Sequence, residues 1–296
     1  MKKVVVLGAS GMLGSAVTSV FLKTNFELFL TSRKASESLL PDYGSHVIFD
    51  VSTDQIDKLD VQLSPGDYIV NCIGIIKSEI QEESLDSRNR ALKVNSEFPL
   101  ELARFAESRG VRVIQIATDC VFSGHRGGYS EIETHDPIDL YGQSKSAGEV
   151  SSKSLLNLRV SIIGPELAKH NSLFDWVARQ PAGATLPGFV NHFWNGIPAM
   201  HFGLLCKAII EEDLFIAGTR HIVPADIVSK SELIRLIAAK ANRQDLNFRD
   251  VMAGENINRT LGTIHPKFNE AIWSAAGYHN PPSIAQLVRE MNASAD

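Results

Sequence analysis

Short apolar runs alternate with longer amphipathic stretches through the first half of the chain. The run Val4–Leu7 is continuous, and a glycine-rich segment and a helical pattern over 15–23 follow it directly. Uninterrupted apolar runs of this length are typical of parallel strands that are buried on both faces. Further predicted strands follow at 27–30, 46–51, 67–72, 111–116 and 156–163. The pattern predicts an α/β fold with a doubly wound parallel sheet of the Rossmann type.

The pattern becomes less regular after Pro165, where prolines and glycines crowd into 181–188. The amphipathic stretch 201–211 predicts a helix that returns to the first layer, and 283–291 predicts a last helix. A further strand is expected at 220–224 and a further helix at 230–241. The change in pattern divides the chain into 1–165 and 166–296, with a returning helix near 199–212 contributed to the first part.

The segment between the first strand and the first helix reads GASGMLG over 8–14, a G-x-x-G-x-x-G spacing. Glycines in this context allow a tight turn and a close approach of the backbone to a pyrophosphate. The helix N-terminus then directs unpaired N–H groups at the phosphates. An ordinary strand–helix turn is the alternative, but the position and spacing favour a dinucleotide cofactor. Residues 1–165 are therefore expected to bind the dinucleotide, and 166–296 to form mainly a smaller α/β substrate-binding region.

The end of the second strand is basic. An NAD site usually has a carboxylate here for the ribose 2′-hydroxyl, whereas this chain has Ser32, Arg33 and Lys34. A guanidinium suits a 2′-phosphate, so the sequence favours NADPH over NADH. A solvated basic turn is the alternative interpretation.

Tyr141 and Lys145 lie four residues apart, on one face of a predicted helix. An ammonium beside a phenol favours the phenolate, which would bring the tyrosine pKa of about 10 closer to neutrality. Such a pair is often only a surface pair. Thr118, at the end of the fifth strand, could face a nicotinamide or merely cap the strand. The three residues together argue against a chance surface pair and indicate a site that delivers a proton.

Composition and charge limit the kinds of molecule that the protein is expected to bind. The net charge of −5 and a pI near 6.0 argue against a general nucleic-acid or membrane-surface binder, so an anionic substrate needs a local basic pocket. Three widely separated cysteines suit a reducing compartment. The apolar run after Lys3 is too short for a signal peptide, and no stretch is long enough to span a membrane, so a cytoplasmic protein is expected. The nine histidines show no metal-binding spacing, and no metal is expected.

With these motifs in order, the chain resembles the extended short-chain dehydrogenases/reductases. More narrowly, GASGMLG, ATDCVFSG and DPIDLYGQSKSAGE are similar to motifs of the dTDP-4-dehydrorhamnose reductases and related nucleotide-sugar 4-ketoreductases. The resemblance is strong over about residues 1–165 and looser beyond. It implies that Tyr141 is the general acid, that Lys145 holds the nicotinamide ribose, and that Thr118 hydrogen-bonds the substrate carbonyl.

The predicted binding residues follow from the motifs and from the resemblance together. The residues expected around the cofactor are Gly8, Ser10, Gly11, Met12, Leu13, Ser32, Arg33, Asp50, Val51, Cys72, Ile73, Gly74, Tyr141, Lys145, Ile163 and Gly164. The residues expected around the substrate are Thr118, Asp119, Cys120, Asn191, Trp194 and Arg259. A rigid packed loop is the alternative for Asn191 and Trp194, and an exposed arginine is the alternative for Arg259.

The resemblance implies NADPH-dependent reduction of the 4-keto group of a nucleoside-diphosphate 6-deoxy-4-keto sugar, in surface polysaccharide biosynthesis. The reductases often carry tyrosine at the position of Cys120, so that substrate contact differs here. Related dehydratases carry Thr-Asp-Glu, whereas this chain has Thr118-Asp119-Cys120, which disfavours dehydration. Two alternatives stay open: a nucleotide-sugar epimerase that retains its cofactor, and a non-catalytic NADP-binding regulatory subunit. The expected partner is the nucleotide sugar, without nucleic acid or membrane, and a homodimer is one assembly that the sequence allows.

Overall fold

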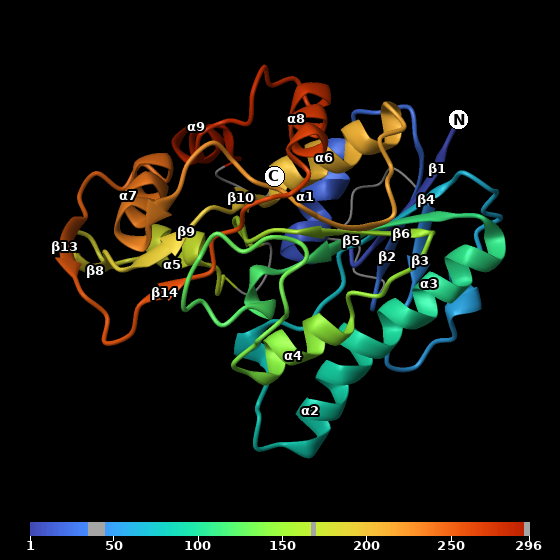
Figure 1. Cartoon of the computed structure of the whole chain (residues 1–296), viewed down its shortest axis with the longest axis horizontal. Helices are drawn as coiled ribbons and strands as arrows, with labels where there is room; N and C mark the ends of the chain where they lie inside the picture. Colours follow the sequence, from blue (N-terminus) through green and yellow to red (C-terminus); the bar gives the residue numbers. More distant parts are fainter. Residues whose placement is uncertain (35–44, 167–169, 293–296) are drawn as a thin grey trace.

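The computed structural model describes residues 1–34, 45–166 and 170–292 (Figure 1). Within these ranges the largest sheet has seven strands, and every pairing in it is parallel. In sheet order the strands are β11 (Gly218–His221), β6 (Leu155–Arg159), β5 (Arg112–Ala117), β4 (Tyr68–Asn71), β1 (Lys3–Leu7), β2 (Glu27–Ser32) and β3 (Ser45–Ile48). The strand order reverses between β1 and β4, and ligands bind at such a switch point, at the carboxyl ends of the strands.

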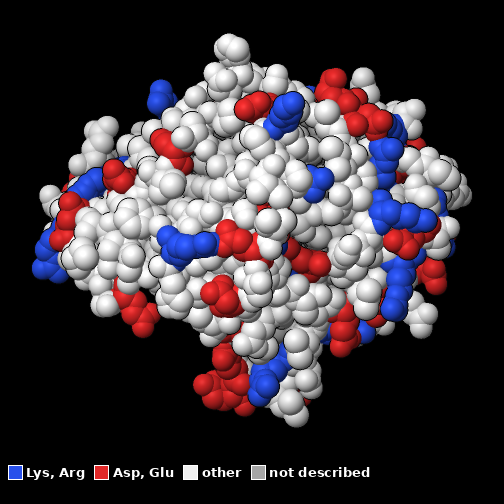
Figure 2. Space-filling model, viewed as in Figure 1, with Lys and Arg blue, Asp and Glu red and all other residues white. Residues whose placement is uncertain are grey.

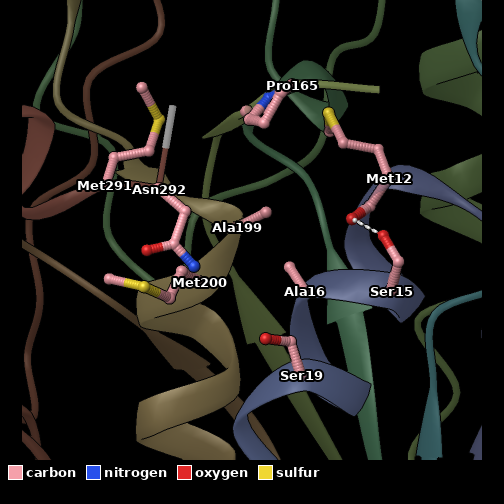
Figure 3. Close-up of a pocket in the computed structure, with 10 residues that line it drawn as sticks. Met12, Ser15, Ala16, Ser19, Pro165, Ala199, Met200, Met291 and Asn292 are labelled. Carbon is pink, nitrogen blue, oxygen red and sulfur yellow. Dashed lines mark hydrogen bonds between the residues drawn. The ribbon is translucent and has the colours of Figure 1, made fainter. Parts of the chain in front are cut away.

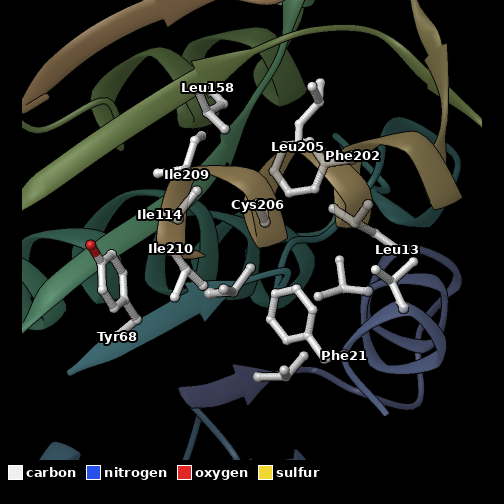
Figure 4. Close-up of a cluster of buried hydrophobic side chains, with 14 of the residues drawn as sticks. Leu13, Phe21, Tyr68, Ile114, Leu158, Phe202, Leu205, Cys206, Ile209 and Ile210 are labelled. Atoms are coloured by element: carbon white, nitrogen blue, oxygen red, sulfur yellow. The ribbon is translucent and has the colours of Figure 1, made fainter. Parts of the chain in front are cut away.

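Helices cover both faces of this sheet, which explains why its strands are apolar throughout. Val4 and Val6 contact one helical layer, and Val5 and Leu7 contact the other, because successive side chains of a strand point to opposite faces. The first layer holds α1 (Met12–Phe21), α6 (Ala199–Glu211) and α8 (Pro266–Ala275), and the second holds α3 (Phe98–Arg109). Figure 4 shows the first layer from inside, where Leu13 and Phe21 of α1 face Phe202 and Cys206 of α6. The predicted doubly wound parallel sheet is confirmed.

A smaller α/β region lies beside the sheet, at the left of Figure 1. Its own core packs three helices against short strands. The helices are α5 (Leu173–Ala178), α7 (Lys230–Lys240) and α9 (Ile284–Glu290). The strands form the sheets β12-β9-β14 (Val228–Ser229, His192–Trp194, Ile257–Asn258), β13-β8 (Asn247–Val251, Thr185–Phe189) and β10-β7 (Ile197–Pro198, Ile162–Ile163).

Several boundaries differ from the predicted ones. The third strand ends at Ile48, before Asp50, and the Phe49 amide still donates to the Ser32 carbonyl, at 2.9 Å. The predicted strand at 220–224 is β11, at the edge of the seven-stranded sheet, although it lies late in the sequence. Helix α2 (Leu85–Leu92) passes through a π-helical turn at 93–97 into α3, so the predicted helix from Asn95 begins earlier. The separate roles expected for 1–165 and 166–296 stay a prediction.

None of the helices in the described ranges combines the length and the apolar character required to cross a membrane. On the face in Figure 2, Lys and Arg side chains are interspersed with Asp and Glu, without a broad area of positive charge. That a nucleic acid is not among the partners stays a prediction.

Candidate functional site

The glycine turn lies at the switch point and has the shape that a diphosphate requires. Gly8 has φ +76°, in the left-handed region that favours glycine. A Cβ on Gly14 would lie 2.0 Å from the Gly8 carbonyl oxygen, so only glycine allows α1 to begin this close to the turn. The Gly8 amide donates to the Thr31 hydroxyl at 3.0 Å, which fixes the turn to the end of β2. The chain therefore presents a tight glycine turn and a helix N-terminus together, an arrangement that suits a diphosphate.

Other predicted cofactor residues gather around this turn. A Cβ on Gly8 would lie 3.0 Å from Ile73, which follows β4 together with Cys72 and Gly74. Across the turn, a Cβ on Gly164 would lie 3.8 Å from the Met12 sulfur. Figure 3 shows the adjoining pocket, which Met12 and Ser15 of α1 line together with Pro165 and Ala199. The structure thus brings together segments that are up to about 150 residues apart in the sequence.

The basic end of β2 has one engaged hydroxyl, on Ser32, and two exposed cations, Arg33 and Lys34. The Ser32 hydroxyl is buried and donates to the Lys34 carbonyl at 2.6 Å. Arg33 is exposed and makes no hydrogen bond or ion pair with any other described residue. Asp50 lies beside this corner, where its carboxylate accepts from the Ser52 amide at 2.8 Å, and Val51 is buried. Arg33 and Lys34 are both exposed, and the Arg33 guanidinium, with its fixed fork of donors, is the better match for a 2′-phosphate.

The three predicted catalytic residues come together at the end of β5, two strands from β1 in the sheet. Asp139 caps α4 (Leu140–Ala147) by accepting from the Gly142 amide at 2.8 Å. The helix packs so closely on the turn after β5 that a Cβ on Gly142 would lie 2.3 Å from the Cys120 carbonyl oxygen. This approach places Tyr141 near Thr118, whose hydroxyl acts on the pKa of the phenol. The same hydroxyl donates to the Asp119 carboxylate at 3.2 Å. Chance surface pairing of Tyr141 with Lys145 does not explain this arrangement.

The protonation of Tyr141 differs from the expectation. Burial raises the pKa of the phenol above its ordinary value, Cys120 and Asp119 add to the rise, and the nearby Thr118 hydroxyl opposes it. Burial likewise lowers the pKa of Lys145 to about 8, opposed by the charge of Glu149. The Lys145 ammonium donates to the Ile116 carbonyl at 3.1 Å. In this structure the expected lowering of the tyrosine pKa is therefore wrong, and the raised pKa keeps the phenol protonated at neutral pH.

The predicted substrate residues Asp119, Cys120 and Arg259 lie together next to this pair. Burial raises the pKa of the Cys120 thiol to about 12, so the thiol is neutral and is no nucleophile. The Arg259 Nε donates to the Phe122 carbonyl at 2.8 Å, and its charge opposes the burial that raises the pKa of Asp119. Arg259 is therefore a partly buried residue of the site, and the alternative of an exposed arginine is wrong.

Asn191 and Trp194 make internal contacts. The Asn191 amide binds the backbone of 253–255 through two donated bonds and one accepted bond, at 2.9–3.1 Å. Trp194 is 3% exposed and donates from Nε1 to the Ser161 hydroxyl at 2.9 Å. These contacts favour the packed-loop alternative, and a substrate contact from either residue stays a prediction.

A buried ion pair behind α4 was not among the predicted residues. Arg159 is 1% exposed and binds the carboxylate of Glu149 bidentately, through Nε at 3.0 Å and through Nη2. Its terminal nitrogens also contact His221 at 2.6 Å and His135 at 2.7 Å. Because Glu149 also acts on the charge of Lys145, the pair connects the sheet with the candidate catalytic helix. An arginine inside the apolar run 155–160 is the sequence signal that could have indicated it, since a buried charge needs a partner.

In the described ranges, no three His, Cys, Asp or Glu side chains gather so that they could hold a metal ion, and the absence of a catalytic metal stays a prediction. The parallel sheet, the glycine cradle and the tyrosine–lysine helix define the class of extended short-chain dehydrogenases/reductases. Within it, the chain belongs to the family described as the RmlD substrate binding domain, whose model matches residues 1–164.

Two curated relatives span most of the chain. One is a probable low-salt glycan biosynthesis reductase, Agl14, of Haloferax volcanii, 28% identical over 244 residues, which are 77% of this chain and 76% of the relative. The other is the methionine adenosyltransferase 2 subunit beta of Bos taurus, 25% identical over 272 residues, which cover 84% of this chain and 75% of the relative.

Two solved structures have the same fold. One is a dTDP-4-dehydrorhamnose reductase from Bacillus anthracis in complex with NADP, with a TM-score of 0.72, 21% identity and 98% coverage of both chains. The other is a UDP-glucuronic acid 4-epimerase from Bacillus cereus with NAD, with a TM-score of 0.74, 15% identity, and coverage of 98% of this chain and 97% of that one. Together with the family match, they confirm the resemblance drawn from the motifs.

Proposed function

We propose that this protein is an NAD(P)-dependent oxidoreductase that reduces the 4-keto group of a nucleoside-diphosphate 6-deoxy-4-keto sugar. The observation that carries the proposal is the meeting of Thr118 with Tyr141 at the carboxyl edge of the sheet, the edge that also carries the glycine turn. The similarity to a glycan biosynthesis reductase and the fold of dTDP-4-dehydrorhamnose reductases support it. We further propose NADPH as the preferred cofactor, a cytoplasmic location and a role in surface polysaccharide biosynthesis.

Each residue of the site has its own role in the proposed reduction. A bound nicotinamide supplies the hydride to the carbonyl carbon, and the protein orients and protonates. Tyr141 gives its phenolic proton to the carbonyl oxygen, and Thr118 donates a hydrogen bond to the same oxygen. Lys145 holds the nicotinamide ribose with its ammonium, while residues 8–13, Ile73 and Gly164 surround the diphosphate and nicotinamide. Residues 166–296 supply the remaining substrate contacts, among them Arg259.

A cofactor-oxidation assay across nucleotide 4-keto-6-deoxy sugars tests the proposal. We expect stoichiometric consumption of NADPH with at least one member of a panel that varies the nucleobase and the sugar configuration. Mass spectrometry of the product should show a gain of two hydrogens. Isomerisation of a sugar without net NADPH consumption would instead establish the epimerase alternative, which the fold of the UDP-glucuronic acid 4-epimerase also allows.

A regulatory, non-catalytic role is a second candidate because one relative is the beta subunit of a methionine adenosyltransferase. The retained Tyr141, Lys145 and Thr118 argue for catalysis in this chain. The two candidates separate in one experiment. NADPH binding without turnover of any keto sugar nucleotide would favour the regulatory role.

Arg33→Ala should raise the KM for NADPH about tenfold or more and leave the KM for NADH nearly unchanged. The reason is that a charge-assisted hydrogen bond to the 2′-phosphate is worth roughly 1.5–3 kcal/mol. The measurement is the ratio of kcat/KM for the two cofactors. Arg249→Ala, which removes another exposed arginine on β13, is the matched control. An unchanged cofactor ratio in the Arg33 variant would reject the 2′-phosphate contact.

A further inference from the structure

His135 joins the segment before α4 both to α4 and to the central sheet. Its Nδ1 lies 2.7 Å from the hydroxyl of Ser146, the residue that follows Lys145 in α4. Its Nε2 lies 2.7 Å from a terminal nitrogen of Arg159, on β6. The Phe122 ring contacts the imidazole edge to face, with 5.6 Å between the ring centres, and limits its rotation. The imidazole therefore forms a histidine bridge from Ser146 to Arg159, between the candidate catalytic helix and the sheet.

The neighbours of His135 fix its tautomer. A guanidinium can only donate, so Nε2 accepts the hydrogen bond from Arg159. Nδ1 then carries the hydrogen and donates to the Ser146 hydroxyl. The same reasoning applies to His221 on β11, whose Nδ1 donates to the Gly262 carbonyl at 2.6 Å while its Nε2 accepts from Arg159 at 2.6 Å. Both imidazoles are neutral in this arrangement, because a proton on either Nε2 would place a second donor and a second positive charge against the arginine.

Charged groups from several segments face the His135 ring. Arg159 faces it from β6, the Glu149 carboxylate lies 3.9 Å from Nε2 beyond the end of α4, and Asp136 follows it in the chain. His221 shares the same arginine from the other side. Burial lowers the pKa of the His135 imidazole, Glu149 opposes this shift, Arg159 adds to it, and Asp136 opposes it. The neutral ring therefore persists to a pH below the ordinary histidine pKa of about 6.5.

We propose that His135 is a positioning residue for the candidate catalytic helix, which its neutral ring holds against the sheet and its protonated ring releases. This role rests on the proposed function, in which Lys145 holds the nicotinamide ribose. Ser146, at one end of the histidine bridge, is adjacent to Lys145 in the helix. A displacement of about 1 Å is enough to weaken a positioned contact. Cofactor affinity should therefore depend on the protonation of His135.

Calorimetric titration of NADP⁺ between about pH 5 and pH 7.5 tests the histidine bridge without requiring turnover. His135→Gln keeps an acceptor for Arg159 and a donor for Ser146, but the amide does not titrate. At about pH 7.5 this variant should bind NADP⁺ within about twofold of the unmodified protein, and at about pH 5 it should bind about threefold more tightly. Because both proteins meet the same ligand at each pH, titration of the NADP⁺ phosphate cancels in the comparison.

Two further variants and a spectroscopic readout complete the test. His135→Leu removes both hydrogen bonds and should raise the Kd for NADP⁺ about three- to tenfold at neutral pH. His279→Gln, which replaces an exposed histidine after α8, is the matched control and should follow the unmodified protein at every pH. In nitrogen-15 NMR of the histidine side chains, the signal that is missing in His135→Gln should report a neutral ring with its hydrogen on Nδ1. If the leucine variant does not fold, the glutamine variant and this signal still decide.

A hydrogen on Nε2 of His135 at neutral pH would overturn the histidine bridge, and so would the same pH dependence in His135→Gln as in the unmodified protein. Lower thermal stability of His135→Leu with an unchanged Kd would show a structural role only. Absence of NADP⁺ binding by the unmodified protein would remove the role of Lys145 and overturn the proposal as well. The expected NADP⁺ pattern in a protein that reduces no keto sugar nucleotide would support the bridge and reject the proposed function. Turnover of a keto sugar with equal pH dependence in both proteins would reject the bridge alone.

Discussion

Tyr141→Phe should lower kcat by about 10²–10⁴-fold and leave the Kd for NADPH nearly unchanged. Phenylalanine keeps the ring in its place on α4 near Thr118, so packing is preserved and only the hydroxyl with its proton is lost. An interaction that operates only in the transition state lowers kcat and kcat/KM together. Steady-state kinetics with the best substrate of the panel, combined with a fluorescence titration of NADPH, measures both quantities.

Two further variants serve as a control and a comparison for this result. Tyr278→Phe removes a phenol that donates to Glu290, at a distant helix, and should leave kcat unchanged. Lys145→Ala should lower kcat and weaken NADPH binding as well, because Lys145 is expected to contact the ribose. Full activity in Tyr141→Phe would remove the tyrosine from the mechanism.

The pH profile distinguishes Lys145 from Tyr141. With the pKa of Tyr141 raised well above its ordinary value, the phenol stays protonated through the neutral and mildly alkaline range. Lys145, with a pKa lowered to about 8, is then the first of the two to lose its proton as the pH rises. The kcat/KM for the cofactor should therefore fall above about pH 8. In Lys145→Arg, whose guanidinium stays charged, this limb should move to higher pH.

The fold could be predicted from the sequence wherever the local pattern of apolar and glycine residues reflects how the segment packs in the whole molecule. Val4–Leu7 is apolar throughout because helices cover both faces of β1, and the glycine turn follows because α1 begins almost in contact with it. β11 is different. Its residues, Gly218–His221, carry a weak apolar pattern, and their place at the edge of the sheet depends on pairing with β6, about 60 residues earlier. No local pattern contains that information.

The candidate site was likewise predictable from the sequence only in part. The order and spacing of the glycine turn, Thr118 and the tyrosine–lysine pair identified the residues that the structure brings together at one edge of the sheet. The buried pair of Arg159 with Glu149 was missed because the partners of Arg159, among them His221 62 residues later, meet it only in the folded chain. The protonation of Tyr141 was missed because burial and nearby Cys120 and Asp119, rather than Lys145, dominate its surroundings.

Arg159→Met should destabilise the fold by about 3–5 kcal/mol, the largest stability effect that we expect from one substitution. Methionine fills much of the arginine volume, but it leaves the Glu149 carboxylate, which is 4% exposed, without its bidentate partner. His221 and His135 also lose a contact. Denaturant unfolding followed by circular dichroism measures the change in free energy, provided that the m-value is unchanged.

The double variant Glu149→Gln/Arg159→Met shows whether the loss comes from the unpaired charge. Removing both charges should recover part of the stability, because a buried pair is costly mainly when one partner is left alone. Activity should respond differently. Since the Glu149 charge opposes the lowering of the Lys145 pKa by burial, Glu149→Gln should lower that pKa further and shift the alkaline fall in kcat/KM to lower pH. A destabilisation below about 1 kcal/mol in Arg159→Met would show that Glu149 finds other partners, and that the ion pair is not what fixes α4 to the sheet.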